Sequence, residues 1–291
     1  MASKSSAGIL PVLAVLGGAV IGASSGLYIK GLAFSSLAMS ALRMAVPFFV
    51  VLPRTARHGL LLGKPGMRGK LLLTSVLNAG RMYLFILAYK LTGMGNAVVL
   101  LYLWPVFALL IDSIMARKKL STAKLGVLVL ATGGVVVMNL HRSFSLSGPD
   151  LLGSACMIVS AFVYAGTNVV YKQALNVMDE SDVLYFQNGV GGIVFLAFLI
   201  AEIPGVPLVQ LGIGIFYGFT IGFIGFGLFF YSMKRLPLFQ YSALSYLEIP
   251  FGVFLGMAFR GETMTLNQAA GIVLIIVGSI LAQRLRTAKD T

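Results

Sequence analysis

The 291-residue chain contains one cysteine, two histidines and only nine acidic residues. Cys156 alone cannot form an internal disulfide or a cysteine-rich metal site. His58 and His141 lie in short basic stretches, so the sequence predicts no histidine-based metal cluster, and the acidic stretch 179–182 is interpreted as a solvated turn or a helix cap. No nucleotide-binding glycine loop and no Ser-His-Asp set is visible. We therefore expect no enzyme, no ATP-driven pump and no cofactor.

Charge is scarce throughout the chain. Charged residues make up 11% of the sequence, whereas soluble domains carry about 25%. Hydrophobic residues make up 58%, and the mean hydropathy is +0.93. The first apolar run follows Lys4 and could be mistaken for a signal peptide, but only further apolar runs come after it. We therefore expect an integral membrane protein that keeps this run as its first transmembrane helix.

Continuous apolar runs of about 20 residues are long enough to cross the hydrocarbon core of a bilayer as α-helices. Transmembrane barrels are built instead from alternating segments of about ten residues. The sequence therefore predicts an all-α membrane protein. Ten transmembrane helices are expected, at residues 9–29, 32–52, 71–90, 96–115, 123–140, 151–171, 183–203, 209–232, 241–259 and 266–283.

Basic residues are distributed unequally between alternate loops. With the N-terminus in the cytoplasm, the inner segments hold 16 lysines and arginines, and the outer segments hold only Lys30, Lys90, Arg142 and Arg260. Because cytoplasmic loops are enriched in Lys and Arg, we expect a multi-pass membrane protein with both termini cytoplasmic. The net charge of +13 follows from this bias, and its spread over short loops predicts no nucleic-acid partner.

The chain also repeats itself at a constant offset of 145 residues. Segment 87–107 aligns with segment 232–252, and this alignment places Pro105 on Pro250. Further along the chain, "GVLVLATGG" aligns with "GIVLIIVGS" at the same offset. The sequence therefore predicts two related halves.

The two halves, 1–145 and 146–291, are each expected to hold five helices. Because five is odd, the second half must enter the membrane upside down. Inverted repeats are typical of secondary transporters, whose substrate site lies near the bilayer midplane between the halves. We expect the halves to superpose after inversion, with helices 123–140 and 266–283 at the periphery.

With these features the chain resembles the drug/metabolite transporter superfamily, in particular its ten-helix members built from two EamA domains. The resemblance covers nearly the whole chain and is carried by Arg43, Pro105, Pro250 and the ending "GETMTLNQAAGIVLIIVGSIL" at 261–281. It implies a fold of two five-helix repeats and the transport of small molecules. Within the superfamily, the chain looks most like the bacterial amino-acid and metabolite exporters, and this resemblance implies a location in the bacterial inner (plasma) membrane.

Glu248 lies inside the apolar run 242–259. A carboxylate in a spanning helix is rare and usually faces the interior of the helix bundle. Two interpretations remain open at this point. Glu248 either binds a substrate amine or titrates during transport, or it forms a fixed ion pair with Arg43 or Arg81 that holds two helices together.

Arg43 and Arg81 are the two basic residues that lie far from the ends of expected helices. Arg43 matches the arginine of the resembled superfamily and is interpreted as a structural or gating residue. Arg81 follows Asn78 by three residues, so both lie on one helix face, and its counterpart in the second repeat is Phe226. This asymmetry favours substrate binding by Asn78 and Arg81. The alternative for Arg81 is an arginine that reaches the membrane surface or binds carbonyl groups.

Several aromatic residues fall near the middle of expected helices rather than at the membrane interfaces, where Tyr and Trp usually gather. A tyrosine hydroxyl at that depth needs a hydrogen-bond partner, so we expect a polar cavity beside these residues. The aromatic candidates are Tyr83, Tyr102, Trp104, Tyr164, Tyr246 and Phe251. Three of them, Tyr83, Tyr102 and Tyr246, are expected to line one central cavity together with Asn78.

Prolines and glycines mark expected points of bending and close packing. Pro47, Pro105 and Pro250 lie within expected helices and should bend them. Pro105 and Pro250 occupy matched positions of the repeat and are assigned a structural or gating role. Small residues let helices pack closely and slide; the candidates are Gly17, Gly18, Gly22 and Gly26 in the first helix and Gly218, Gly222, Gly225 and Gly227 in the eighth.

These features predict a secondary transporter that exports small metabolites by alternating access, and we expect amino acids with apolar or aromatic side chains. The substrate amine would bind Glu248 or tyrosine hydroxyls, and the carboxylate would bind Arg81 or an asparagine. The alternatives are a proton-coupled exporter of cationic drugs and, from another class, a non-transporting membrane scaffold or sensor. The expected partners are a small-molecule substrate and the lipid bilayer, with the protein acting as a monomer.

Overall fold

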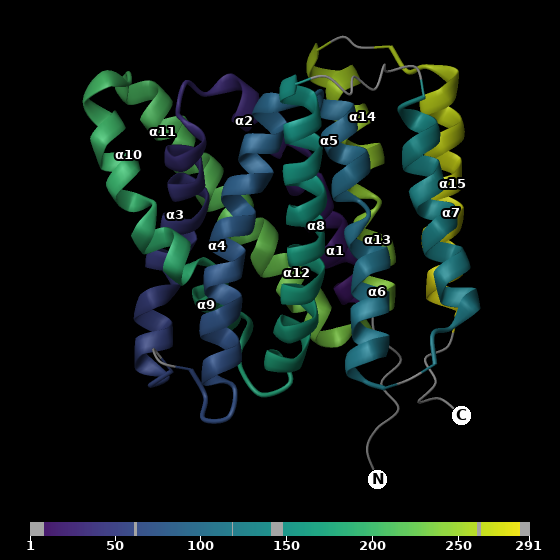
Figure 1. The fold of residues 1–291 in the computed structure, drawn as a ribbon, viewed down its shortest axis with the longest axis horizontal. Helices are drawn as coiled ribbons and strands as arrows, with labels where there is room; N and C mark the ends of the chain where they lie inside the picture. Colours follow the sequence, from purple (N-terminus) through teal and green to yellow (C-terminus); the bar gives the residue numbers. More distant parts are fainter. Residues whose placement is uncertain (1–8, 61–62, 118, 141–147, 261–262, 286–291) are drawn as a thin grey trace.

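The computed structural model describes residues 9–60, 63–117, 119–140, 148–260 and 263–285. Every regular element within these residues is helical, and the helices stand side by side in one bundle (Figure 1). The first half of the chain forms α1 (Ile9–Ala23), α2 (Ser25–Gly31), α3 (Ser36–Arg57), α4 (Arg68–Leu91), α5 (Met94–Leu101), α6 (Trp104–Met115) and α7 (Thr122–Met138).

The second half begins with α8 (Gly148–Ala174), a single long helix. It continues with α9 (Glu180–Val194), α10 (Leu196–Glu202), the short 3-10 turn η1 (Ile203–Gly205), α11 (Leu208–Tyr217), the π-helical segment η2 (Gly218–Gly225), α12 (Phe226–Arg235), α13 (Leu238–Ser245), α14 (Glu248–Arg260) and α15 (Leu266–Arg284). Several of these helices join end to end, so that α11, η2 and α12 cross the bundle as one span.

Eight helices, counted across such junctions, are long and apolar enough to cross a bilayer. The pair α9 and α10, bent by 50°, brings the number to nine. The one expected span still unaccounted for, 123–140, corresponds to α7, whose 17 residues rise about 26 Å. This is somewhat less than the roughly 30 Å of a hydrocarbon core, so α7 meets the length expected of a spanning helix less well than the others.

The helices turn apolar side chains outward and polar side chains inward. On α4, the side chains of Leu72, Leu73 and Val76 are 45–59% exposed, whereas Asn78 and Arg81 are buried. A soluble protein would show the opposite arrangement, because exposed hydrocarbon is unfavourable in water. In a bilayer, an apolar exterior and a polar interior are both favourable. The all-α membrane fold expected from the sequence is confirmed.

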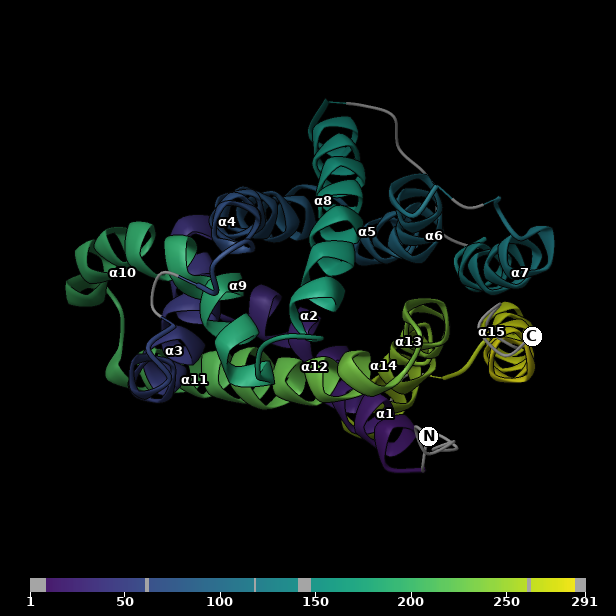
Figure 2. The same ribbon diagram turned by 90° about the horizontal axis from the view of Figure 1, so that it is seen from below.

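Consecutive spans run in opposite directions through the bundle. α1 begins and α15 ends at the same end of the bundle, whereas α8 begins at the opposite end (Figure 1). The packing is symmetric under exchange of the halves, because α3 packs on α9 and α7 on α15, and the pair α4 with α8 has its counterpart in α12 with α1. α7 and α15 lie together at one edge, as expected for the fifth and tenth helices (Figure 2).

Two spans break at matched positions of the repeat. α5 ends at Leu101 and α6 begins at Trp104, while α13 ends at Ser245 and α14 begins at Glu248. Pro105 and Pro250 therefore fall in the first turns of α6 and α14, where a residue without an N–H is tolerated. α3, by contrast, continues as one helix through Pro47. Each matched proline thus accompanies a break rather than a gentle bend.

The eighth span approaches α3 through glycines. A Cβ atom on Gly218 would lie 2.2 Å from the backbone oxygen of Leu42, and one on Gly222 would lie 2.9 Å from Nη1 of Arg43. Side chains at these positions would push η2 and α3 apart. Close packing of this kind is the usual role of small residues between membrane helices, and here it holds Arg43 in the interior of the bundle.

Candidate functional site

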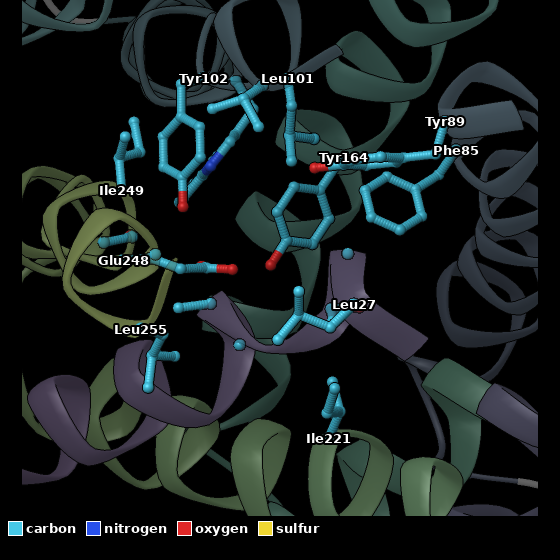
Figure 3. Close-up of a pocket in the computed structure, with 18 of the residues that line it drawn as sticks. Leu27, Phe85, Tyr89, Leu101, Tyr102, Tyr164, Ile221, Glu248, Ile249 and Leu255 are labelled. Atoms are coloured by element: carbon cyan, nitrogen blue, oxygen red, sulfur yellow. The ribbon is translucent and has the colours of Figure 1, made fainter. Parts of the chain in front are cut away.

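A cavity of about 230 Å³ lies inside the bundle and is lined by residues from both halves of the chain. Figure 3 shows side chains from several helices converging on it. The charged residues of its wall are Arg43, Arg81 and Glu248. The aromatic residues of its wall are Phe85, Tyr89, Tyr102, Trp104, Tyr164, Phe226, Phe229 and Tyr241. The cavity therefore combines charges of both signs with large aromatic faces.

Glu248 is the first residue of α14 and follows the break after α13. Its side chain points into the cavity, and the hydroxyl groups of Tyr102 and Tyr164 point toward it (Figure 3). The start of a helix is a favourable place for a carboxylate, because the free N–H groups there carry partial positive charge. The break at Leu247 thus places an acidic group at the cavity wall instead of in the middle of a continuous helix.

Arg43 projects from α3 toward the same cavity. The residue is only 3% exposed, and its Nη1 atom has no hydrogen-bond partner among the described residues. The guanidinium carbon lies 4.4 Å from the centre of the Phe226 ring. A cation stacked on an aromatic ring is attracted by the ring face, so Phe226 supports the arginine without neutralising it.

Arg81 is held from two sides. Its Nε donates a hydrogen bond to Oδ1 of Asn78 at 3.0 Å, and its guanidinium carbon lies 4.4 Å from the centre of the Tyr164 ring. Asn78 in turn donates from Nδ2 to the backbone oxygen of Gln187 at 2.6 Å. Asn78 therefore orients Arg81 and ties α4 to α9, but it is not part of the cavity wall.

The charged groups of the cavity do not pair with one another. Among the described residues, no ion pair joins Glu248 to Arg43 or Arg81, since the ion pairs found there all involve residues 54–58, 179–182 and 234–235. The interpretation of Glu248 as a fixed ion pair with one of these arginines is therefore wrong. With two guanidinium groups and one carboxylate, the wall carries an excess of one positive charge.

The expectation that Tyr83, Tyr102 and Tyr246 line one cavity with Asn78 holds only for Tyr102. Tyr246 is fully buried, donates a hydrogen bond to the backbone oxygen of Tyr102 at 3.0 Å, and contacts the hydroxyl of Thr132 at 2.7 Å. Tyr83 is half-buried and packs against an apolar cluster of α3 and α4 that includes Met39 and Ile86, outside the cavity wall. For Tyr83 the cause is helical geometry, because a residue two positions from the cavity-facing Arg81 points about 200° away from it on α4. Tyr246 lies in the break between α13 and α14, and its hydroxyl is directed toward Tyr102 and Thr132 instead.

The remaining aromatic candidates divide in the same way. Trp104 and Tyr164 line the cavity and pack against each other with ring centres 5.0 Å apart. Phe251 follows Glu248 on α14 but does not contribute to the wall. Five of the eight candidate binding residues therefore lie together at the cavity: Arg81, Tyr102, Trp104, Tyr164 and Glu248.

Sequence reasoning did not select Phe85, Tyr89 and Tyr241 for the cavity wall. Phe85 and Tyr89 follow Arg81 by four and eight residues, so they share its helix face. That spacing was visible in the sequence and could have identified both. Tyr241 carries no such signal, because it lies on α13, before the break that precedes Glu248.

A second charged cluster lies at the end of the bundle where α3 and α12 end and α9 begins. His58 Nδ1 lies 2.9 Å from Oδ2 of Asp182, and Asp182 is only 1% exposed. The acidic stretch also pairs with basic residues of α3 and α12; these pairs are Arg54–Asp179, Lys234–Asp179, Lys234–Glu180 and Arg235–Glu180. Of the two expectations for this stretch, the solvated turn is wrong, whereas the position at a helix start is right, because Asp179 is the N-cap residue of α9. Its residues also tie three spans together.

Three residues of this cluster, His58, Asp179 and Asp182, offer ligand atoms within 4.8 Å of one another. A metal ion there would compete with Arg54 and Lys234, each of which lies 3.6 Å from an oxygen of Asp179. Since Arg54 and Lys234 already form ion pairs with Asp179, we interpret this cluster as a set of ion pairs between helices.

The chain matches the model of the EamA-like transporter family twice, over residues 9–140 and 151–283. It is 26% identical to an uncharacterized transporter of Archaeoglobus fulgidus over 93% of this chain and 95% of that one. It is 22% identical to the uncharacterized transporter YoaV of Bacillus subtilis over 83% of this chain and 85% of that one. A crystal structure with 18% sequence identity shares the fold, with a TM-score of 0.74 over 98% of this chain and 100% of that one. The chain therefore belongs to the EamA-like transporter family.

Proposed function

We propose that this membrane transporter exports amino acids with apolar or aromatic side chains across the bacterial plasma membrane. The proposal rests mainly on one observation, a cavity between the halves in which Glu248, Arg43 and Arg81 lie among aromatic rings without pairing with one another. Charged groups inside a membrane protein usually mark a substrate or ion pathway. A zwitterion offers the opposite charge to both kinds of group at once.

The chemistry of an amino acid fits this wall group by group. The ammonium group would bind Glu248 and donate further hydrogen bonds to the hydroxyl oxygens of Tyr102 and Tyr164, which point toward the carboxyl group (Figure 3). The carboxylate would bind Arg81, which Asn78 already orients. An apolar or aromatic side chain would then lie against the remaining rings, such as Phe85 and Trp104.

The excess positive charge of the wall argues against cationic drugs as the main substrates. A cation entering the cavity would meet Arg43 and Arg81, and only Glu248 would attract it. Like charges brought together in a poorly solvated site repel each other more strongly than in water. A substrate with a carboxylate avoids this repulsion, so the arrangement favours zwitterions and anions over cations.

Alternating access gives both charged clusters a role in transport. Met138 at the end of α7 and Gln268 at the start of α15 extend the cavity wall toward the end of the bundle opposite the start of α1. The ion pairs around Asp179, Glu180 and Asp182 lie at the other end and hold three spans together there. We propose that these pairs close that end in this conformation and separate when the cavity opens to the other side.

The orientation belongs to the same proposal. The bias of basic residues supports cytoplasmic termini, so the ion-paired end would face the cytoplasm and the cavity would face outward in this conformation. Export as the physiological direction follows from the resemblance to bacterial exporters. A single chain contributes both halves of the cavity, which is consistent with transport by a monomer.

Exchange in liposomes tests the proposed function. The purified protein is reconstituted into liposomes that contain an unlabelled amino acid, and the uptake of the labelled compound is followed. We expect exchange of phenylalanine and leucine, little exchange of lysine, and none in protein-free liposomes. Exchange confined to organic cations, with no amino acid taken up, would contradict the proposal and favour the cationic-drug alternative.

A further inference from the structure

Arg43 has fewer partners than Arg81, the other guanidinium group of the cavity. Arg81 has the Asn78 amide on Nε and Tyr164 beneath its guanidinium group. Nη1 of Arg43 has no hydrogen-bond partner in the part of the chain that the structure describes, although only 3% of the residue is exposed. Among the described residues no ion pair includes Arg43. Within the described ranges, Nη1 of this buried guanidinium group thus has no acceptor, and no ion pair neutralises the charge.

This state is unfavourable unless something else supplies the acceptor. A buried donor without an acceptor destabilises a folded protein, and a buried charge without a partner does so more strongly. The structure nevertheless holds the group firmly, with the Phe226 ring 4.4 Å away on one side and no space for a Cβ atom on Gly222 beside Nη1. Arg43 is thus positioned at the cavity wall with hydrogen-bonding capacity that the protein itself leaves unused.

The chemistry of arginine indicates which ligand group would use that capacity. A guanidinium group is planar and presents several N–H donors in a rigid array that matches a carboxylate. Aromatic rings and the hydroxyls around the cavity bring no negative charge to Arg43, and Glu248 is not paired with it. The missing partner is therefore an anionic group of the transported molecule.

We propose that Arg43 binds the carboxylate of the substrate together with Arg81, so that a free carboxylate is the feature the cavity requires. The inference rests on the proposed role of this cavity in transport and assigns Arg43 a binding role beyond the structural or gating role expected from the sequence. It also names a wider ligand class. Because the wall carries one excess positive charge, aromatic and apolar carboxylic acids without an amine belong to this class alongside amino acids.

Binding to the full-length protein in lipid nanodiscs tests this inference with four related ligands. Phenylalanine has both charges, 3-phenylpropanoate has only the carboxylate, phenethylamine has only the amine, and phenylalaninamide keeps the amine but has lost the carboxylate. For the wild type we expect binding of the first two compounds and at least about tenfold weaker binding of the last two, because a charge-assisted hydrogen bond is lost.

The variants Arg43→Gln and Glu248→Gln should change different parts of this selectivity. In Arg43→Gln, the ratio of phenylalanine to phenylalaninamide affinity should fall by about tenfold, and phenethylamine should bind better than to the wild type. In Glu248→Gln, the same ratio should stay high, while phenylalanine loses any advantage over 3-phenylpropanoate. Arg43→Lys keeps the charge without the planar array of donors and should retain part of the selectivity. If Arg43→Gln does not fold, Arg43→Lys takes its place in the comparison.

The outcomes separate this inference from the proposed function. An Arg43→Gln protein that binds all four ligands with wild-type ratios, or weakens all four equally, would overturn the role of Arg43 and leave amino-acid transport standing. If Arg43→Lys has to be used because Arg43→Gln does not fold, wild-type affinity ratios in Arg43→Lys would likewise overturn the role of Arg43. A wild type that binds phenethylamine but neither phenylalanine nor 3-phenylpropanoate would overturn the inference and the proposed function together.

Discussion

Gly22 and Glu248 touch across the wall of the cavity. A Cβ atom on Gly22 would lie 2.7 Å from Oε1 of Glu248 and 2.9 Å from its carboxyl carbon. Gly22 belongs to α1 in the first half of the chain, and Glu248 begins α14 in the second half. The position of the carboxyl group therefore depends directly on how closely the two halves approach each other.

Gly22→Ala should displace the Glu248 carboxyl group and reduce transport. The methyl group would occupy the space of a carboxyl oxygen, and that oxygen belongs to a side chain that can rotate away. Loss of a charge-assisted hydrogen bond to the substrate amine, worth about 1.5–3 kcal/mol, lowers affinity at least about tenfold. Gly17→Ala on the same helix is the matched control, since its methyl group would meet Leu228 at an ordinary 3.4 Å. Equal substrate affinities in the two variants would contradict the assignment of Glu248.

Gly218→Ala should destabilise the fold itself. The new methyl group would lie 2.2 Å from the backbone oxygen of Leu42, and a backbone atom cannot rotate aside. Overpacking of this kind costs about 1–3 kcal/mol, so we expect a lower melting temperature in detergent. Gly227→Ala is the comparison, because a Cβ there meets no atom within 4 Å. Equal melting temperatures would show that η2 and α3 are packed less tightly than described.

Asp182→Ala should weaken the end of the bundle without changing the cavity. It removes the buried partner of His58 and leaves that ring without its carboxylate, at a cost of about 1–3 kcal/mol. Thermal unfolding should show this loss, while the affinity for phenylalanine changes little. Asp150→Ala, at the start of α8, serves as the control because no ion pair of Asp150 is present among the described residues. A stable Asp182→Ala protein would argue against this cluster as a closure.

The spans, and the breaks within two of them, were largely predictable from the sequence. Apolar runs of spanning length and matched prolines are local features, and a proline in a first turn follows from its missing N–H. The repeat at an offset of 145 placed Pro105 on Pro250, and the structure has a break just before each of them. The marginal length of α7 was less visible, because the expected span 123–140 extends two residues beyond Met138, where the helix ends.

The cavity wall was predictable only in part. The charged residues Arg81 and Glu248 stood out because charge is rare in a spanning helix. Tyr83 and Tyr246 were wrongly placed because mid-helix depth says nothing about the direction a side chain faces. Gly22 was selected only as a small residue for close helix packing, since its contact with Glu248 depends on how α1 packs against α14 in the folded protein.

Glu248→Gln tests the central claim, that the cavity carboxylate takes part in transport. Because no ion pair joins Glu248 to Arg43 or Arg81 among the described residues, the neutral side chain should leave no arginine newly unpaired. Glutamine also has nearly the same size as glutamate, so the packing against Gly22 is kept. We therefore expect a variant that folds and melts like the wild type.

The most direct measurement is phenylalanine exchange by wild type and Glu248→Gln in matched liposomes, recorded over a range of pH together with the melting temperature of the same preparations. The account predicts an unchanged melting temperature, exchange reduced at least about tenfold through the lost charge-assisted hydrogen bond, and an altered pH profile. A variant with wild-type exchange rates and an intact pH profile would show that Glu248 takes no part in transport and would contradict the account.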